Sequence, residues 1–114
     1  MNILKTIQII AVIGTILTGL YSLLRPESIT GFTGLSPVGG RGITEIRSIL
    51  GGLFIGLGIA VLVLGTREVY QTLGIMYLAI AVVRLVSIFV DKSSVQSNWI
   101  SFATEIVFGI ILVV

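Results

Sequence analysis

Four ionisable side chains stand inside otherwise apolar stretches of this sequence: Glu45, Arg47, Arg84 and Glu105. A charge near the centre of a bilayer costs about 2.5 to 3.5 kcal/mol on insertion scales, so such residues need partners. Two of them are cationic and two are anionic, and the set can therefore neutralise itself. We expect Arg84 and Glu105 to pair first, because a guanidinium can hold a carboxylate through two hydrogen bonds.

Further polar side chains recur at helical spacing from these charges. Residues three, four or seven positions apart share a face of a helix, so the polar side chains should gather into one patch or small pocket. Three interpretations are open: a salt-bridge network that fixes the order of the helices, a site for a ligand or an ion relay, and hydrolytic catalysis. The additional members of the patch are Ser48, Tyr77, Ser87, Asp91 and Ser101.

The residue types that are missing limit the chemistry of this patch. The sequence has no cysteine and no histidine, which removes thiolate nucleophiles, haem ligation by those residues and nearly every zinc arrangement. It also lacks a GxSxG motif and an Asp-rich metal loop. We therefore predict no catalytic residue, no metal site and no cofactor. Carboxylates could bind a cation, but two arginines oppose it, and an anionic headgroup or carboxylate ligand suits them better.

The composition is that of a membrane protein. Of 114 residues, 55% are hydrophobic and 11% are charged, whereas soluble domains contain about 25% charged residues. The formal net charge is +2 and the basic residues are scattered singly, so a nucleic-acid partner is excluded. Membrane lipids are the expected surroundings, and the chain is expected to be a multi-pass membrane protein.

Four segments are long and apolar enough to cross a bilayer, which takes roughly 20 residues of helix. We predict an all-α integral membrane four-helix bundle with up-down topology, formed by a single domain over residues 1–114. The first segment is expected to be a retained helix, because its apolar stretch is too long for a signal peptide and no small-x-small cleavage site follows it. The segments are residues 3–24, 43–64, 72–90 and 98–114.

The connection over residues 25–42 is the longest, and the other two are short enough to make their helices antiparallel neighbours. Pro26 should end the first helix, because a proline disfavours helical geometry in the residue before it. A short interfacial helix is expected after Pro26, with Phe32 dipping into lipid. Tyr21, Tyr70 and Trp99 lie near predicted helix ends and are expected to be headgroup anchors.

Helical geometry places the charges in one half of the membrane. Arg84 lies seven residues before Asp91, where the third segment ends, and Glu105 lies seven residues after the fourth begins. At 1.5 Å per residue both lie about 10 Å below the same surface. Glu45 and Arg47 enter that half from the long connection. They point about 200° apart on a helix, so they need separate partners, among them Arg84, loop carbonyls or a headgroup phosphate.

Glycines are concentrated in the second segment, at Gly51, Gly52, Gly56 and Gly58. Gly52 and Gly56 form a GxxxG motif, the spacing that lets two helices approach closely in lipid. Two interpretations are open. The glycines pack against another helix of the same chain, or they form the contact with a second copy or with a partner protein.

A family resemblance covers nearly the whole chain and is carried by residues 44–52 (TEIRSILGG), Gly56, Gly58, Arg84, Ser87, Asp91 and Glu105. On these residues the sequence resembles the DUF4345 family, small bacterial four-helix membrane proteins known only as a domain of unknown function. The family pattern N-E-x-R-A-x-Y-G-G is changed here at Thr44, Ser48 and Leu50, and Val83 stands where the family usually has glycine before its arginine. The resemblance implies a four-helix domain of a bacterial inner membrane and no particular activity. It also implies that Glu45, Arg47, Arg84 and Glu105 occupy the family's buried polar positions.

Two functions fit these features. The first is a structural or accessory subunit that docks by its glycine faces onto a larger membrane complex or forms a homodimer, with the charges as an internal clamp. The second is a binder or carrier of a lipid, small amphiphile or anion in an intramembrane Arg/Glu pocket. An intramembrane enzyme has little support.

Overall fold

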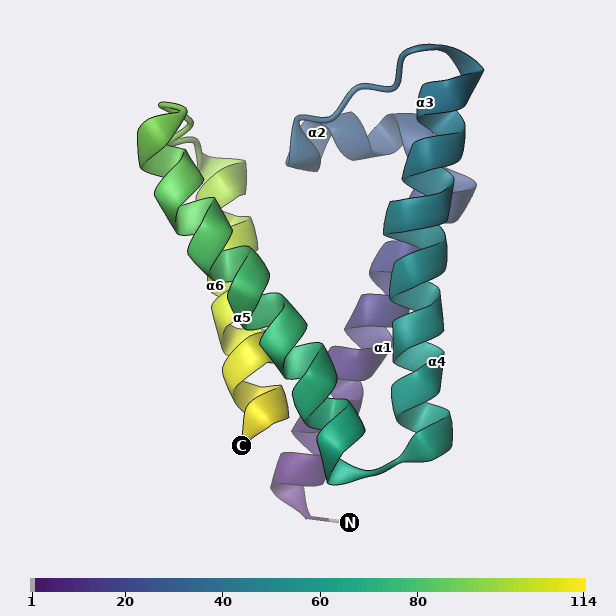
Figure 1. Cartoon of the computed structure of the whole chain (residues 1–114), viewed down its shortest axis with the longest axis vertical. Coiled ribbons are helices and arrows are strands. Elements are labelled where there is room, and N and C mark those ends of the chain that lie inside the picture. Colours follow the sequence, from purple (N-terminus) through teal and green to yellow (C-terminus); the bar gives the residue numbers. More distant parts are fainter. Residues whose placement is uncertain (1) are drawn as a thin grey trace. The chain divides into compact units, whose positions relative to one another are not determined.

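The computed structural model describes residues 2–114, and every regular element in that range is a helix (Figure 1). The all-α fold class that the sequence predicts is confirmed. The chain divides into two compact units, each treated below by itself. One unit comprises Met1–Ala11 with Gly65–Val114, here called the α5–α6 unit, and the other comprises Val12–Leu64, here called the α1–α4 unit.

Four helical stretches of the described chain are long and apolar enough to cross a membrane. The first is α1 (Ile3–Leu24), and the second is a continuous run of α3 (Gly39–Glu45), η2 (Ile46–Leu53) and α4 (Phe54–Leu64). The third and fourth are α5 (Arg67–Val90) and α6 (Gln96–Val113). These four stretches are those of a membrane protein, as the composition predicts.

The first helix has the predicted bounds, but the other three begin earlier than hydropathy predicts. The hydrogen-bond ladder of a helix continues past the apolar stretch into polar residues, and hydropathy does not detect that part. The start of α5 illustrates this, because the Thr66 hydroxyl caps the helix by accepting a hydrogen bond from the Val69 amide at 3.3 Å. The observed starts are Gly39, Arg67 and Gln96 in place of residues 43, 72 and 98.

The long connection is partly helical. After α1 ends at Leu24, a 3-10 turn η1 (Pro26–Ile29) leads into a short helix, α2 (Thr30–Thr33). Gly34 ends α2 with a φ of 75°, a conformation that glycine adopts without steric cost. Phe32 is 42% exposed and its ring lies 5.9 Å from that of Tyr21. The short helix after Pro26 is thus present, and of this connection only Arg25 and residues 34–38 lack regular structure.

Within the α1–α4 unit, α1 packs antiparallel against η2 and α4 through glycines. A Cβ at Gly51 would lie 3.1 Å from the Leu23 Cβ, and a Cβ at Gly19 would lie 2.8 Å from the Gly51 carbonyl oxygen. A Cβ at Gly58 would overlap Ile16. The backbones approach closely because these positions have no side chain. In this stretch η2 is a π-helix of 8 residues, a form that is usually confined to a single turn.

Within the α5–α6 unit, α5 and α6 form an antiparallel hairpin that is also closed by glycine. A Cβ at Gly74 would lie 2.9 Å from the Gly109 carbonyl oxygen. The first turns of α1 belong to this unit, where the Gln8 side chain donates a hydrogen bond to the Ile111 carbonyl at 3.0 Å. Lys5 lies with its Nζ 3.8 Å from the centre of the Tyr70 ring.

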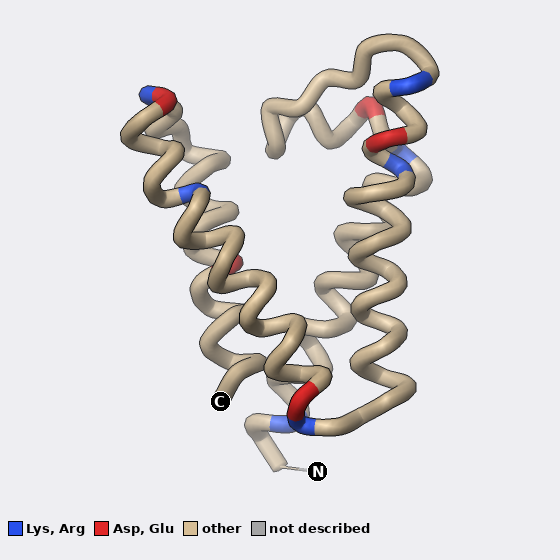
Figure 2. Tube along the Cα trace, viewed as in Figure 1, with Lys and Arg blue, Asp and Glu red and all other residues tan. Residues whose placement is uncertain are grey.

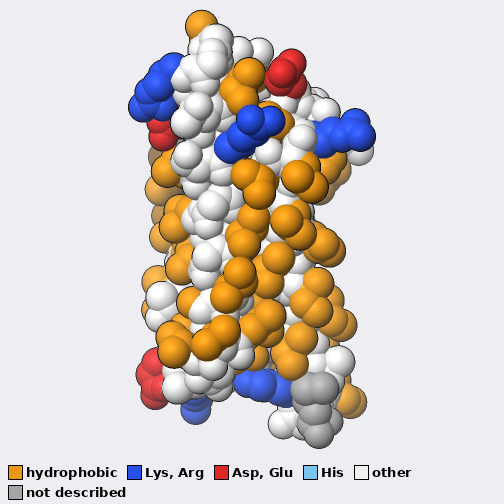
Figure 3. All heavy atoms as spheres, turned by 90° about the vertical axis from the view of Figure 1, so that its right-hand side faces the viewer, with side chains coloured by type: hydrophobic (Ala, Val, Ile, Leu, Met, Phe, Trp, Pro, Cys, Tyr) orange, Lys and Arg blue, Asp and Glu red, His pale blue; other side chains and the backbone are white. Residues whose placement is uncertain are grey.

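Charged residues lie mostly at or near helix ends, and the helices between them are largely uncharged (Figure 2). The space-filling view of the face that includes Gly39–Leu64 shows hydrophobic side chains over the middle of the helix, with backbone and small side chains between them (Figure 3). Such a surface suits lipid or an apolar partner rather than water. Arg84 lies within α5 and Glu105 within α6.

Candidate functional site

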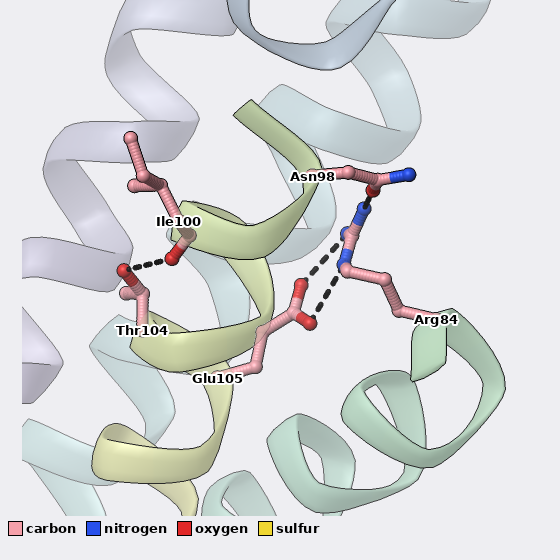
Figure 4. A network of polar contacts seen from close by, with 5 residues as sticks. All are labelled: Arg84, Asn98, Ile100, Thr104 and Glu105. Atoms are coloured by element: carbon pink, nitrogen blue, oxygen red, sulfur yellow. Dashed lines mark hydrogen bonds and ion pairs between the residues drawn. The ribbon is translucent and has the colours of Figure 1, made fainter. Parts of the chain in front are cut away.

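The centre of the candidate site is the ion pair between Arg84 on α5 and Glu105 on α6 (Figure 4). The Arg84 Nε donates to one carboxylate oxygen and Nη2 to the other, both at 2.8 Å. The Glu105 side chain is 11% exposed and that of Arg84 is 29% exposed. The sequence predicted this pair, and the two-fold hydrogen bonding is the geometry in which arginine binds carboxylate most strongly.

Asn98, in the first turn of α6, extends this pair into a network. Its side-chain oxygen accepts a hydrogen bond from the Arg84 Nη1 at 2.8 Å (Figure 4). Its amide nitrogen donates to the Ser93 carbonyl at 3.0 Å and to the Ser93 hydroxyl at 3.1 Å. We call Arg84, Glu105, Asn98 and Ser93 the polar network. It fixes the start of α6 and the connection before it against α5, at the end of the hairpin away from Gly74.

A groove of about 540 Å³ lies over the polar network. One wall of the groove is a stripe of α5 that runs from apolar side chains to polar ones and ends at Asp91. The connection between α5 and α6 and the start of α6 form the rest of the lining. The volume falls within the range of small-molecule sites, about 300 to 1,000 Å³. The lining residues are Ala79, Ile80, Val83, Arg84, Ser87, Asp91, Ser93 and Asn98, all from the α5–α6 unit.

Arg84 lines this groove, but it is already paired and does not act there as a free arginine. Glu105 neutralises Arg84, and the guanidinium has five N–H donors, of which the polar network uses three. Two N–H donors of Arg84 therefore remain. Among the lining residues Asp91 is the charged group for which the structure shows no ion pair within the described chain. The groove combines hydrogen-bond donors with one carboxylate, and it does not present an unpaired cation.

The two predicted site charges of the second helical stretch, Glu45 and Arg47, are solvent- or lipid-exposed and have partners within their own unit. Glu45 forms an ion pair with Arg41, one turn earlier, in which the side chains are 51% and 79% exposed. The Arg47 Nε donates to the Leu23 carbonyl on α1 at 3.0 Å. Buried positions for Glu45 and Arg47, which the family resemblance implied, are therefore wrong for these side chains.

The four predicted packing glycines divide into two faces. Gly51 and Gly58 are buried against α1, as the intramolecular interpretation predicted. Gly52 and Gly56, the GxxxG pair, are exposed, and a Cβ at Gly56 would meet no atom within 4 Å. Ser48 precedes Gly52 by four residues and is also exposed. We call Ser48, Gly52 and Gly56 the open glycine face.

The comparison with known families agrees with these features. A family model described as a domain of unknown function (DUF4345) matches residues 3–114. The chain belongs to the DUF4345 family. No curated protein and no solved structure matches it.

The remaining predicted site residues of this DUF4345 protein have separate places. Ser87 and Asp91 line the groove as predicted from their spacing to Arg84. Tyr77 is 6% exposed and its ring packs edge-on against Phe108, with 5.5 Å between the ring centres, inside the hairpin. Ser101 is half-buried on α6 and does not line the groove.

One predicted anchor is wrong. Tyr70 is only 4% exposed, because its ring lies under Lys5 inside the α5–α6 unit, and it cannot reach the headgroup layer as an anchor would. Tyr21 is 43% exposed and Trp99 is half-buried, with its indole nitrogen donating to the Ser94 hydroxyl at 2.9 Å. Those two remain predicted anchors.

Sequence reasoning missed three polar residues of this DUF4345 protein. Asn98 lies seven residues before Glu105, a spacing that places both on one face of α6 and that could have identified it. Arg41 lies four residues before Glu45, the spacing of an ion pair within a helix. Ser93 carried no such signal, because its contact depends on how the short connection folds.

Proposed function

We propose that this DUF4345 protein is a structural or accessory subunit that docks onto a larger membrane assembly through the open glycine face. The observation that carries the proposal is the division of the glycines. Gly51 and Gly58 complete the contact with α1, while Gly52 and Gly56 keep the GxxxG spacing on the exposed side of the same helix. A glycine pair at this spacing lets a second transmembrane helix come within van der Waals contact of the backbone.

The rest of the chain suits this role. The segments between the four long helical stretches are short: residues 25–38, 65–66 and 91–95. Most of the surface that can contact a partner within the described chain therefore belongs to apolar helices. Arg84 and Glu105 neutralise each other and are joined by two hydrogen bonds inside one hairpin, which makes this ion pair a clamp that holds α5 and α6 together.

The docking test replaces both Gly52 and Gly56 by leucine. We expect the gently solubilised wild-type protein to migrate on a native gel well above its monomer mass of 12.2 kDa plus detergent, and the variant to migrate as the monomer. The variant should remain folded, because neither position faces a neighbouring helix in its unit. The matched control is Ala103→Leu, a small-to-large change at an exposed position of α6 that should leave the complex intact.

Each other result of this test counts against docking onto a larger assembly. A wild-type protein that migrates as a bare monomer, or a variant complex of unchanged size, would refute docking by this face. A complex that contains this chain alone would assign the face to a homodimer and contradict the accessory role. Mass spectrometry of the excised native band identifies which chains are present.

A second candidate function is the binding of a lipid, small amphiphile or anion in the groove over the polar network. The groove itself favours it, because apolar and hydrogen-bonding side chains share one concave surface of about 540 Å³. We expect native mass spectrometry of the protein in mild detergent to show one retained small molecule. Val83→Trp fills the groove at a side chain that is 65% exposed, so it should abolish retention while the protein stays folded.

A further inference from the structure

The groove has an order of chemical groups along its length. Ala79, Ile80 and Val83 form an apolar part, Arg84 and Ser87 follow, and Asp91 lies at the end of α5. Twelve residues separate Ala79 from Asp91, so the groove follows about 18 Å of helix at 1.5 Å per residue. A groove of this length can hold a lipid headgroup near Asp91 and part of an acyl chain near Ala79.

The side chains that line the groove offer hydrogen-bond donors and one carboxylate. The donors are the two remaining N–H groups of Arg84 and the O–H groups of Ser87 and Ser93, for which the structure shows no hydrogen-bond acceptor in the described chain. The Asn98 side chain already donates to Ser93 and accepts from Arg84. The carboxylate is that of Asp91, which lies one helical turn beyond Ser87.

From this order we infer that the groove binds a zwitterionic phospholipid whose headgroup carries a primary ammonium, of the phosphoethanolamine type. The phosphate accepts hydrogen bonds from Arg84, Ser87 and Ser93, the ammonium donates to Asp91, and an acyl chain lies along Ile80 and Val83. The inference rests on the second candidate function and specifies its ligand.

Charge is the reason for preferring a zwitterion to an anion. Since Glu105 already neutralises Arg84, a purely anionic headgroup would gain hydrogen bonds at the arginine but would meet the negative Asp91 at the mouth of the groove. A headgroup with both charges satisfies both ends. A choline headgroup has the same charges but no N–H to donate, so it should bind less well than a primary ammonium.

The test measures lipid retention by native mass spectrometry. The protein is incubated with equal amounts of phosphatidylethanolamine, phosphatidylcholine and phosphatidylglycerol that carry the same acyl chains. We expect the ethanolamine lipid to be retained about tenfold over the glycerol lipid, which corresponds to about 1.4 kcal/mol. Asp91→Asn should remove that preference and leave the glycerol lipid bound as well or better. Glu68→Gln, at an exposed carboxylate of the first turn of the same helix, is the matched control and should change nothing.

The outcomes separate this inference from the binding function. The wild-type protein could instead retain phosphatidylglycerol preferentially, and Val83→Trp could abolish that retention. This result would keep the groove as a binding site but overturn its preference for a zwitterionic headgroup. If a folded Asp91→Asn variant retained the ethanolamine lipid over the glycerol lipid to the same extent as the wild-type protein, the role of Asp91 would be overturned. No retained lipid of any class would overturn both the inference and the binding function. Competition by soluble phosphoethanolamine, without displacement by lipid, would assign the site to a free metabolite instead.

Discussion

Replacing Arg84 alone or Glu105 alone by methionine should destabilise the α5–α6 hairpin more per substitution than replacing both residues together. Breaking a buried ion pair by deleting one partner costs about 3 to 5 kcal/mol, because the other charge is left without compensation. Glu105 is 11% exposed, so Arg84→Met should lie near the upper end of this range. Glu105→Met should lie lower, since Arg84 is 29% exposed and keeps its hydrogen bond to Asn98.

The double variant gives the coupling energy between the two residues. Two hydrogen bonds of 2.8 Å join them. Single interhelical hydrogen bonds in a membrane average about 0.6 kcal/mol and reach at most about 1.7 kcal/mol in double-mutant cycles, so two such bonds give about 1 to 3 kcal/mol. The sum of the single losses should therefore exceed the loss in the double variant by about 1 to 3 kcal/mol. Reversible unfolding in mixed micelles of mild detergent and dodecyl sulfate measures all four proteins.

The exposed pair of Arg41 and Glu45 is the matched control. Its side chains are 79% and 51% exposed, and exposed pairs contribute about 0 to 1 kcal/mol. A cycle of the same substitutions there should give a coupling energy below about 1 kcal/mol. If the cycle of Arg84 with Glu105 also gave less than this value, the two charges would not be paired in the folded protein and the clamp would be refuted.

Three further predictions concern single contacts, each measured as the free energy of unfolding in the same micelles. Asn98→Leu should cost about 1 to 3 kcal/mol, because it removes the hydrogen bonds to Arg84 and to the connection; no loss would contradict its place in the polar network. Gly74→Ala should cost about 1 to 3 kcal/mol, since its Cβ would lie 2.9 Å from a carbonyl oxygen, whereas Gly56→Ala, with no neighbour within 4 Å, should not destabilise; equal effects would contradict the glycine assignments. Tyr70→Phe should keep the contact between Lys5 and the ring, whereas Tyr70→Leu should lose about 0.5 to 2 kcal/mol. A larger loss in the phenylalanine variant would mean that the Tyr70 hydroxyl, rather than its ring, stabilises the protein.

The Arg84–Glu105 pair could be predicted because two measures from the sequence agree. Arg84 lies seven residues before Asp91, the predicted end of one helix, and Glu105 lies seven residues after Asn98, the predicted start of the next. The short connection between them makes these two helices antiparallel. Because the two residues are expected at the same depth in the membrane and on neighbouring helices, few other partners are left for either charge. Ser87 and Asp91 followed from the same helical periodicity, and both line the groove.

The partners of Glu45 could not be predicted from hydropathy, because hydropathy placed the start of the helix too late. If the helix started at residue 43, it would have no residue four positions before Glu45. The prediction therefore placed the partner of Glu45 on another element. The helix in fact begins at Gly39, so Arg41 lies one turn before Glu45 on the same face and forms the ion pair. The error in one helix boundary thus became an error in the charge network.

The role of each glycine could not be read from the GxxxG motif either. The motif gives a spacing along the helix, but it does not say which side of the helix faces α1. In η2 the hydrogen bonds run from residue i to i+5, which widens the turn and alters the direction of every side chain after it. The glycines at Gly51 and Gly58 face α1, and the GxxxG pair at Gly52 and Gly56 does not.

The charges are satisfied locally, and this separates the two proposed functions. Glu45 has its partner Arg41 and Arg47 has the Leu23 carbonyl, all in the α1–α4 unit, whereas Arg84 and Glu105 pair inside the α5–α6 unit. A single cluster of four charges would have coupled every substitution in one unit to the other. Because each set is complete in its own unit, the open glycine face and the groove can be altered one at a time. Loss of the complex in the Gly52 and Gly56 variant, with lipid retention unchanged, would then assign docking and lipid binding to different helical hairpins of one small protein.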